Sequence, residues 1–367
     1  MNSKYYPLIK LARQAALMKR RLTLPFKLVS SGFAKSESYY PELPQKSRFI
    51  IFMELLGHVL KYGSIEWHYF SYGFDIKGLR DRSDYIDDNW FLWKANMLNT
   101  VLPDRDNSCI LRDKKLFSDF LSIWGFKSPK VIGEIRDGEA ENTALNHVVS
   151  TNGDYFFKPL DGQCGKGVFK VSVSDDSCMV NGENIGRDGL KNAVLVQIQK
   201  DTYLVQERVV QHPSLNMIYD KSINTVRLVT VYDKKKDVVI PFSAVLRVGA
   251  NGNVVDNWAA GGLAIGIDLE KGILNEYGLY KHGNGTKSPT HPDTGTAFKG
   301  FEIPYWKESL EKATELHRHL LPMAIIGWDI AITPDGPLFI EGNDNMEISI
   351  NQEANKGLKK EFEEVFN

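Results

Sequence analysis

The sequence predicts an α+β fold, in which antiparallel sheets with flanking helices follow a mainly helical N-terminal region. Two observations lead to this class. Apolar side chains recur at helical spacing within the first hundred residues, whereas short runs of β-branched and aromatic residues dominate from about residue 155 onward. Turn residues separate many of these runs, and one clear helical segment interrupts them. This order of elements is typical of α+β proteins.

The composition excludes several classes of protein. Hydrophobic residues make up 43% of the 367 residues, which excludes a disordered or collagen-like chain, and the length predicts two or three packed units. A formal net charge of −1 argues against a nucleic-acid binder. Cys109, Cys164 and Cys178 are too few and too scattered for a disulfide framework or a four-cysteine zinc site. We therefore expect a cytoplasmic protein. The sequence does not predict its oligomeric state.

The N-terminal segment is basic. Its cations Lys4, Lys10, Arg13, Lys19, Arg20, Arg21 and Lys27 all precede the first acid, Glu37. No apolar run has the length of a membrane span, and no signal peptide is expected. Two interpretations stay open. The segment is either a solvated helix face, or a basic amphipathic arm that contacts a polyanionic partner or the anionic inner face of a membrane.

The first hundred residues contain a helical stripe and an aromatic segment. Residues 48–61 carry apolar side chains at helical spacing and stop before Gly63, which predicts a helix. Residues 64–98 are rich in Trp, Tyr and Phe, which predicts a core or an interface; a platform that stacks on sugar rings is the alternative. Residues 113–124 are expected to form a short helix.

The remaining chain alternates strands and turns. The predicted strands are 155–158, 168–173, 203–206, 226–232, 238–248, 263–269, 325–332 and 338–341. One helix, over residues 306–321, precedes the last pair of strands, and Pro322 stops it.

The last two strands predict a hairpin with facing acids. A loop over residues 333–337, which contains Pro-Asp-Gly-Pro, would pair Ile332 with Leu338. Three pairs further from the loop, Asp329 would then stand opposite Glu341, with the two side chains on one face.

These acids suggest a metal site. Asn343 follows Glu341 by two residues, so it shares the same face. Carboxylates so close repel each other unless a cation neutralises them, and two carboxylates with an amide oxygen suit Mg²⁺ or Mn²⁺ shared with substrate phosphates. The alternative is a solvent-facing hairpin whose acids meet by chance.

A glycine-rich turn joins two of the predicted strands. Gly162, Gly165 and Gly167 would let backbone N–H groups approach an anion, and Lys158 and Lys166 could add positive charge. The spacing differs from that of a P-loop. A phosphate-binding loop and a plain hairpin are both compatible with this pattern.

Two further strands carry unusual polar residues. Gln206 and Glu207 follow an apolar run. This pattern fits a segment that binds the edge of an adenine base, and it also fits a strand end with exposed polar residues. Arg227 and Arg247 lie within β-branched strands, where a charge is costly without an anionic partner. They would either hold phosphates or form structural salt bridges.

The order of these motifs resembles the ATP-grasp superfamily from about residue 110 to the C-terminus. The motifs are Asp113-Lys114-Lys115-Leu116-Phe117, Lys158 with the glycine loop, Gln206-Glu207, Thr225-Val226-Arg227 and Asp329 with Glu341-Gly342-Asn343. The segments 222–227, 260–268, 291–295 and 327–329 resemble the sugar-transfer-associated ATP-grasp group, which is related to the glutamate ligases acting on ribosomal protein and is associated with polysaccharide biosynthesis.

The resemblance implies a fold and a nucleotide site. Residues 1–110 would precede two α+β subdomains that grip ATP, with the glycine flap in 111–204 and the metal site in 205–367. Lys114 and Lys158 would contact the α- and β-phosphates. The remaining nucleotide contacts would be the flap residues Gly162, Gln163, Gly165, Lys166 and Gly167, the adenine site of Gln206, Glu207 and the Val209 backbone, and Asn224 or Thr225 for the ribose, where many relatives have an acid.

The resemblance also implies the chemistry. Asp329, Glu341 and Asn343 would bind two Mg²⁺ ions, and Arg227 and Arg247 would stabilise the transferring phosphoryl group. The expected activity is an ATP-dependent carboxylate–amine ligase that forms an acyl phosphate and then an amide, joining small molecules such as an amino acid and a sugar or sugar nucleotide. The alternatives are an ATP-dependent phosphotransferase and a nucleotide-binding scaffold of a polysaccharide assembly complex.

Overall fold

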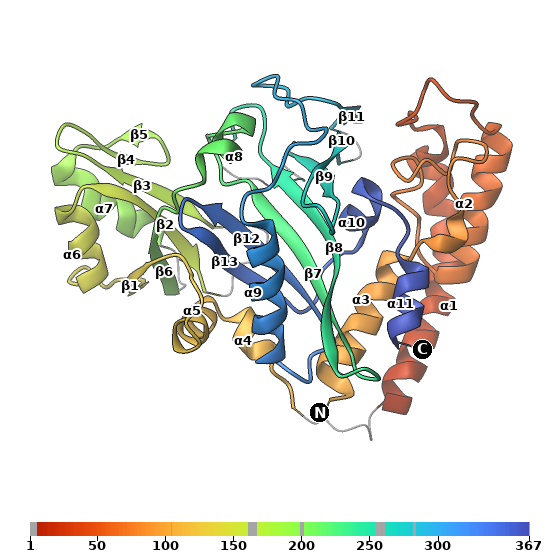
Figure 1. Ribbon diagram of the computed structural model, residues 1–367, viewed down its shortest axis with the longest axis horizontal. Helices are drawn as coiled ribbons and strands as arrows, with labels where there is room; N and C mark the ends of the chain where they lie inside the picture. The colour runs from red at the N-terminus through yellow and green to blue at the C-terminus, as the bar shows by residue number, and fades with distance from the viewer. Residues whose placement is uncertain are drawn as a thin grey trace.

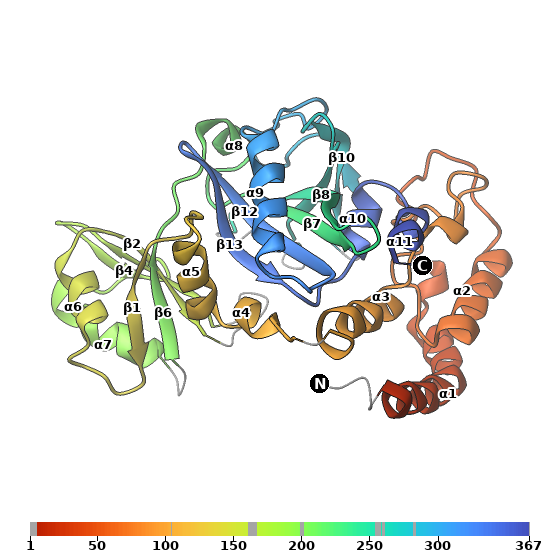
Figure 2. The same cartoon turned by 60° about the horizontal axis from the view of Figure 1, so that its bottom comes forward.

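The protein consists of a helical region and two antiparallel sheets arranged in a row. The computed structural model describes residues 6–103, 105–160, 167–198, 202–253, 258, 261–281 and 284–366. The N-terminal helices lie at one end, the seven-stranded sheet lies in the centre and the six-stranded sheet lies at the other end (Figures 1 and 2). This arrangement confirms the predicted α+β class.

The N-terminal region is helical, as predicted. Its elements are α1 (Tyr6–Ser31), η2 (Phe33–Lys35), α2 (Arg48–Tyr62), η3 (Arg82–Asp84), α3 (Asp88–Asn96) and η4 (Met97–Val101). The Ser47 side chain caps the start of α2, and Gly63 ends this helix in a left-handed conformation, with φ of 66°. Among the described residues, no helix combines the length and apolar character that crossing a bilayer requires.

The aromatic segment forms the core of this region. Five of its rings are buried together, namely Tyr69, Phe70, Tyr72, Phe74 and Tyr85. The predicted core interpretation is therefore confirmed for these residues.

The six-stranded sheet has the strand order β1-β6-β2-β3-β4-β5. Its strands are β1 (Val131–Arg136), β2 (Gly153–Pro159), β3 (Phe169–Val173), β4 (Cys178–Val180), β5 (Glu183–Asn184) and β6 (Thr202–Glu207). Its core includes residues from α6 (Thr143–Ser150) and α7 (Arg187–Gln197). The sequence did not predict β1, in which Gly133 and Glu134 interrupt the apolar run. The predicted boundary between the two subdomains, after residue 204, falls inside β6. The domain limits stay a prediction.

The seven-stranded sheet has the order β11-β10-β9-β8-β7-β12-β13. Its strands are β7 (Thr225–Asp233), β8 (Val238–Val248), β9 (Leu263–Ile267), β10 (Leu274–Tyr280), β11 (Lys287–Ser288), β12 (Ile325–Thr333) and β13 (Gly336–Asn343). The helices that the structure describes around this sheet are α4 (Ser108–Arg112), α5 (Lys114–Ile123), α8 (Pro213–Ile218), α9 (Trp306–Arg318), α10 (Ser349–Ala354) and α11 (Lys359–Phe366). Among them, α9 lies along the sheet in Figure 1 and buries Ala313 and Leu316 in its core.

The β12–β13 hairpin differs from the prediction near its turn. Thr333 pairs with Gly336, so the loop is two residues long, and Ile332 pairs with Pro337 rather than with Leu338. A bulge follows, because the register shifts by one residue after Ile330. The bulge compensates for the shorter loop.

Candidate active site

The predicted pairing of Asp329 with Glu341 is confirmed. The two residues lie directly opposite each other in the β12–β13 ladder, and Asn343 pairs with Gly327 two positions further along. Asp329 is 2% exposed. The Asn343 side chain lies 3.4 Å from Glu341 Oε1, and it donates a hydrogen bond to that oxygen. Two carboxyl groups and one amide therefore cluster on one face of the sheet.

Two arginines meet Asp329 from the neighbouring strands. Arg227 on β7 pairs with Asp329 across the ladder and binds both carboxylate oxygens, with Nη2 at 2.9 Å from Oδ2. Arg247 on β8 donates from Nη2 to the same Oδ2 at 3.1 Å and also to Thr225 Oγ1. The predicted arginines and the predicted metal ligand therefore form one buried network, in which salt bridges give the arginines their anionic partner.

The environment moves the pKa values of the two acids apart. Burial alone would raise the pKa of Asp329, but the charges of Arg227 and Arg247 outweigh it and hold this pKa well below its usual range. Burial raises the pKa of Glu341, and the negative charge of Asp329 raises it further. The pKa values of the two acids are therefore shifted in opposite directions, and a hydrogen bond joins Glu341 to Asp329.

This donor set fits a divalent cation. The oxygens of Asp329, Glu341 and Asn343 are hard ligands of the type that Mg²⁺ and Mn²⁺ prefer. Burial and the negative charge of Asp329 both raise the pKa of Glu341. A cation bound by these oxygens would offset the negative charge of the pair.

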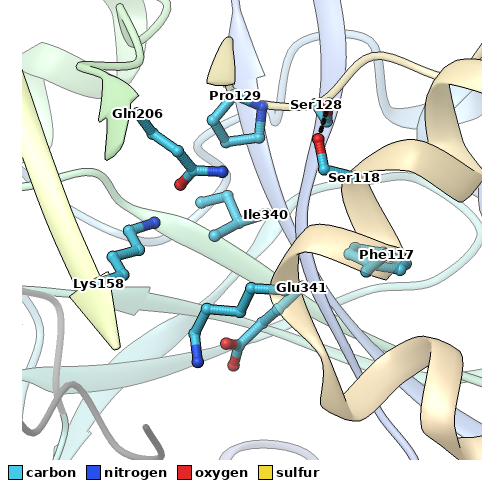
Figure 3. Close-up of a pocket in the computed structure, with 9 residues that line it drawn as sticks. Phe117, Ser118, Ser128, Pro129, Lys158, Gln206, Ile340 and Glu341 are labelled. Carbon is cyan, nitrogen blue, oxygen red and sulfur yellow. Dashed lines mark hydrogen bonds between the residues drawn. The ribbon is translucent and has the colours of Figure 1, made fainter. Parts of the chain in front are cut away.

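A cavity next to Glu341 brings four of the predicted residues together. Its lining residues come from both sheets, from α5 and from the segment between α5 and β1: Lys114, Phe117, Ser118, Ser128, Pro129, Lys158, Gln206, Ile340 and Glu341. Figure 3 shows Lys158 and Gln206 on one side of this cavity and Glu341 on the other. Its volume of about 30 Å³ holds one or two water molecules, so a nucleotide would have to widen it.

Strand pairing explains why two of these side chains face the cavity. Phe156 of β2 lies opposite Gln206 of β6, and Lys158 follows Phe156 by two residues. Because side chains two residues apart share a face, Lys158 and Gln206 project from the same side of the sheet. Gln206 is 5% exposed.

Lys114, at the start of α5, also lines the cavity. Asp113 caps this helix by accepting hydrogen bonds from the N–H groups of Lys115 and Leu116, both at 2.8 Å. The cap places Lys114 at the first helical position, where its Nζ donates to Leu160 O at 3.2 Å. This contact ties α5 to the chain that leaves β2.

The other predicted nucleotide residues differ in their surroundings. Gly162, Gln163, Gly165 and Lys166 lie outside the described residues. Gly167 has φ of 74°, and a side chain there would place Cβ 2.9 Å from Pro159. The conformation at Gly167 thus requires glycine.

Glu207, Val209 and Asn224, which were predicted as nucleotide contacts, do not line the cavity. Glu207 is ion-paired with Lys130 at 2.7 Å, and Val209 is partly buried. Asn224 is fully buried and donates from its side chain to Leu215 O and Tyr219 O. These contacts hold Asn224 within the fold, and its role toward a ribose stays a prediction.

Sequence reasoning missed five lining residues: Phe117, Ser118, Ser128, Pro129 and Ile340. Helical spacing could have found the first two, because they follow Lys114 by three and four residues and thus share its helix face. Ile340 lies in the bulge, which no local pattern indicates.

A second cluster of polar groups lies in the helical region. His58, Glu66 and Asp87 are buried close enough together to be considered as metal ligands. However, Asp87 lies 3.0 Å from Nε2 of His58, whereas Glu66 lies 3.6 Å from Nδ1. The acids thus approach opposite ring nitrogens, which is the geometry of an ion-paired imidazole rather than of ligands around one ion.

Two antiparallel sheets meet at a cavity that is lined by Lys114, Lys158 and Glu341, which is the arrangement of an ATP-grasp fold. The family model described as sugar-transfer-associated ATP-grasp matches residues 95–367. The chain belongs to this family.

The search of curated proteins finds no match. Among solved structures, the VanG D-Ala:D-Ser ligase from Enterococcus faecalis is 14% identical to this chain, with a TM-score of 0.42. The match covers 71% of this chain and 62% of that protein. The L-amino acid ligase from Bacillus licheniformis is 13% identical with a TM-score of 0.40, over 68% of this chain and 44% of that one.

Proposed function

We propose that the protein is an ATP-dependent carboxylate–amine ligase. The observation that carries the proposal is the row of Glu341, Asp329, Arg227 and Arg247 on one sheet face, beside a cavity with two lysines. This arrangement supplies positive charge for phosphates and oxygen ligands for Mg²⁺. Family membership and the similar ligase structures support the same reaction class.

The reaction needs no nucleophilic side chain. A substrate carboxylate attacks the γ-phosphorus of ATP, the bond to the β–γ bridging oxygen breaks, and ADP leaves behind an acyl phosphate. An amine then attacks the acyl carbon, so that phosphate leaves, an amide forms and the amine loses a proton. The enzyme contributes positioning and electrostatic stabilisation.

Each charged group has a role in this scheme. Lys114 and Lys158 would neutralise the ATP phosphates from the cavity wall. Within the described residues Arg227 binds Asp329 through Nε and Nη2, which leaves Nη1 for an oxygen of the transferred phosphoryl group. Mg²⁺ held by Asp329, Glu341 and Asn343 would offset the charge of the phosphates. Gln206, buried at the cavity edge, would read the adenine.

We further propose that an amino acid and a sugar or sugar nucleotide are the two substrates. The description of the family associates it with sugar transfer, which supports a role in surface polysaccharide biosynthesis.

The test is ADP release with Mg²⁺-ATP, in a screen of amino acids against carboxylated and amino sugars. The Glu341→Ala variant removes a metal ligand, and Glu363→Ala, on the exposed face of α11, is the matched control. We expect turnover and a condensed product only when both substrates are present, and none with Glu341→Ala. ADP release with one acceptor substrate alone, together with a phosphorylated form of that acceptor as the product, would instead identify a phosphotransferase.

A further inference from the structure

The outward side of α1 carries an apolar stripe. Six large side chains on this helix are between 61% and 78% exposed, namely Leu8, Leu11, Met18, Leu22, Phe26 and Val29. They recur at intervals of three, four and seven residues, so they form one continuous row along the helix. We refer to these six residues as the α1 stripe.

The other side of α1 attaches the helix to the protein. Leu28 is 1% exposed, Leu17 lies against Gly63, and Arg21 donates to Lys61 O at 2.9 Å. Leu17, Arg21 and Leu28 are separated by four and seven residues, which places them together on a helix face distinct from the stripe. Folding therefore anchors α1 on α2 and leaves the stripe facing outward.

The stripe lies on a helix without acids. Residues 6–31 contain six cations and no Asp or Glu. Arg13 stacks over Trp93 at 3.9 Å, and Arg21 binds α2, so these two cations face the protein. Lys10, Lys19, Arg20 and Lys27 are exposed, and none of them is ion-paired within the described part of the chain; Lys27 Nζ lies 5.9 Å from the centre of the Trp67 ring.

These charges discriminate between two occupants of the stripe. A second copy of the protein would place α1 against α1, and the cations of both helices would meet without any acid between them. An anionic bilayer offers acyl chains for the apolar row and a negative surface that attracts a helix with six cations and no acid.

We propose that the α1 stripe binds the surface of an anionic membrane. The helix lies parallel to the bilayer plane with its apolar row in the interface, because its six charges oppose a transverse position. The inference stands on the N-terminal region and does not depend on the ligase activity.

The test is cosedimentation of the full chain with vesicles of phosphatidylcholine, alone or mixed with phosphatidylglycerol. The double variant Leu22→Ser/Phe26→Ser shortens the apolar row at two sites that are 72% and 78% exposed, so the fold is retained. Lys19→Gln/Lys27→Gln removes charge and keeps the row. Val196→Ser, on α7 and 70% exposed, is the matched control for loss of an exposed apolar side chain.

We expect the wild-type protein to bind the anionic vesicles, with binding weakened by salt. Each double variant should bind the anionic vesicles at least roughly tenfold more weakly than the wild type. Val196→Ser should bind as the wild type does. The proposal is overturned if the wild type stays in the supernatant, or if the serine variant sediments like the wild type. It is also overturned if the wild type dimerises without lipid and the serine variant is a monomer, because a second copy would then cover the stripe.

Discussion

Glu341 lies directly opposite Asp329 across the β12–β13 hairpin, and the pKa values of the two carboxyl groups move in opposite directions. Arg227 and Arg247 are on the Asp329 side of this pair, which leaves Glu341 in the weaker positive field. A cation bound at Glu341 would add positive charge on the side of the pair that the two arginines do not contact.

We expect Glu341→Gln to stabilise the metal-free protein at neutral pH. The folded pKa of Glu341 lies above its ordinary value, so the wild type loses stability as the pH rises through that folded pKa. The amide cannot ionise, and it removes the repulsion with Asp329. Thermal unfolding in a chelator should give a higher Tm for the variant than for the wild type, whereas Mg²⁺-ATP should raise the Tm of the wild type alone.

The control for this experiment is Glu363→Gln, in which the same chemical change is made on an exposed face of α11. Its Tm should match the wild type with and without Mg²⁺-ATP. A Glu341→Gln variant that melts below the wild type in chelator would contradict the proposed charge balance.

Arg227→Met should destabilise the protein strongly. The change leaves the buried Asp329 carboxylate with Arg247 as its remaining guanidinium partner, and breaking one side of a buried ion pair costs about 3–5 kcal/mol. Urea unfolding measures this loss. Arg208→Met removes an exposed arginine, and its partner Asp154 keeps an ion pair with Lys170, so the change should cost about 0–1 kcal/mol. Equal losses in the two variants would mean that the Asp329 network contributes little.

The facing acids were predictable from sequence although the turn was not. The predicted loop was too long and the predicted ladder contained no bulge; the two errors cancel at Asp329 and Glu341. Alternation along each strand is a local property, so it indicated the shared face of Glu341 and Asn343 correctly. The bulge depends on packing between the strands, and no local pattern reports it.

The link between Arg227 and Asp329 could not be predicted in the same way. These residues are separated by 102 positions, and their pairing depends on which strands become neighbours in the seven-stranded sheet. The sequence indicated only that a buried arginine needs an anionic partner. A substrate phosphate and a protein carboxylate were both possible partners for this arginine. The order of the strands in the sheet places Asp329 beside Arg227.

His68 should couple the helical region to the central sheet in a pH-dependent way. Its ring lies between Glu353 of α10 at 2.5 Å and Asp88 of α3 at 3.3 Å. Burial lowers the pKa of His68, but the two carboxylates outweigh burial and hold it well above 6.5. The stabilisation is therefore complete below pH 6.5 and is lost as the pH rises through the folded pKa.

His68→Gln tests this coupling by denaturant unfolding over a range of pH. The difference in stability between the wild type and the variant should be largest at mildly acidic pH and should shrink at alkaline pH. A difference that does not change with pH would show that His68 contributes packing rather than charge.

His317 should make the protein sensitive to acid. Its buried ring accepts a hydrogen bond from Thr230 Oγ1 at 2.7 Å and donates one to Met323 O at 2.9 Å, and burial lowers its pKa from 6.5 to about 4. Stability is thus fully present above pH 6.5 and is lost as the pH falls toward 4, by an amount on the order of 3 kcal/mol. His317→Gln should flatten this part of the pH profile in chemical denaturation, because the amide takes up no proton. His319→Gln, two residues further along and stacked on Trp124 at the surface, should keep the wild-type slope, and loss of the slope in both variants would refute the assignment to His317.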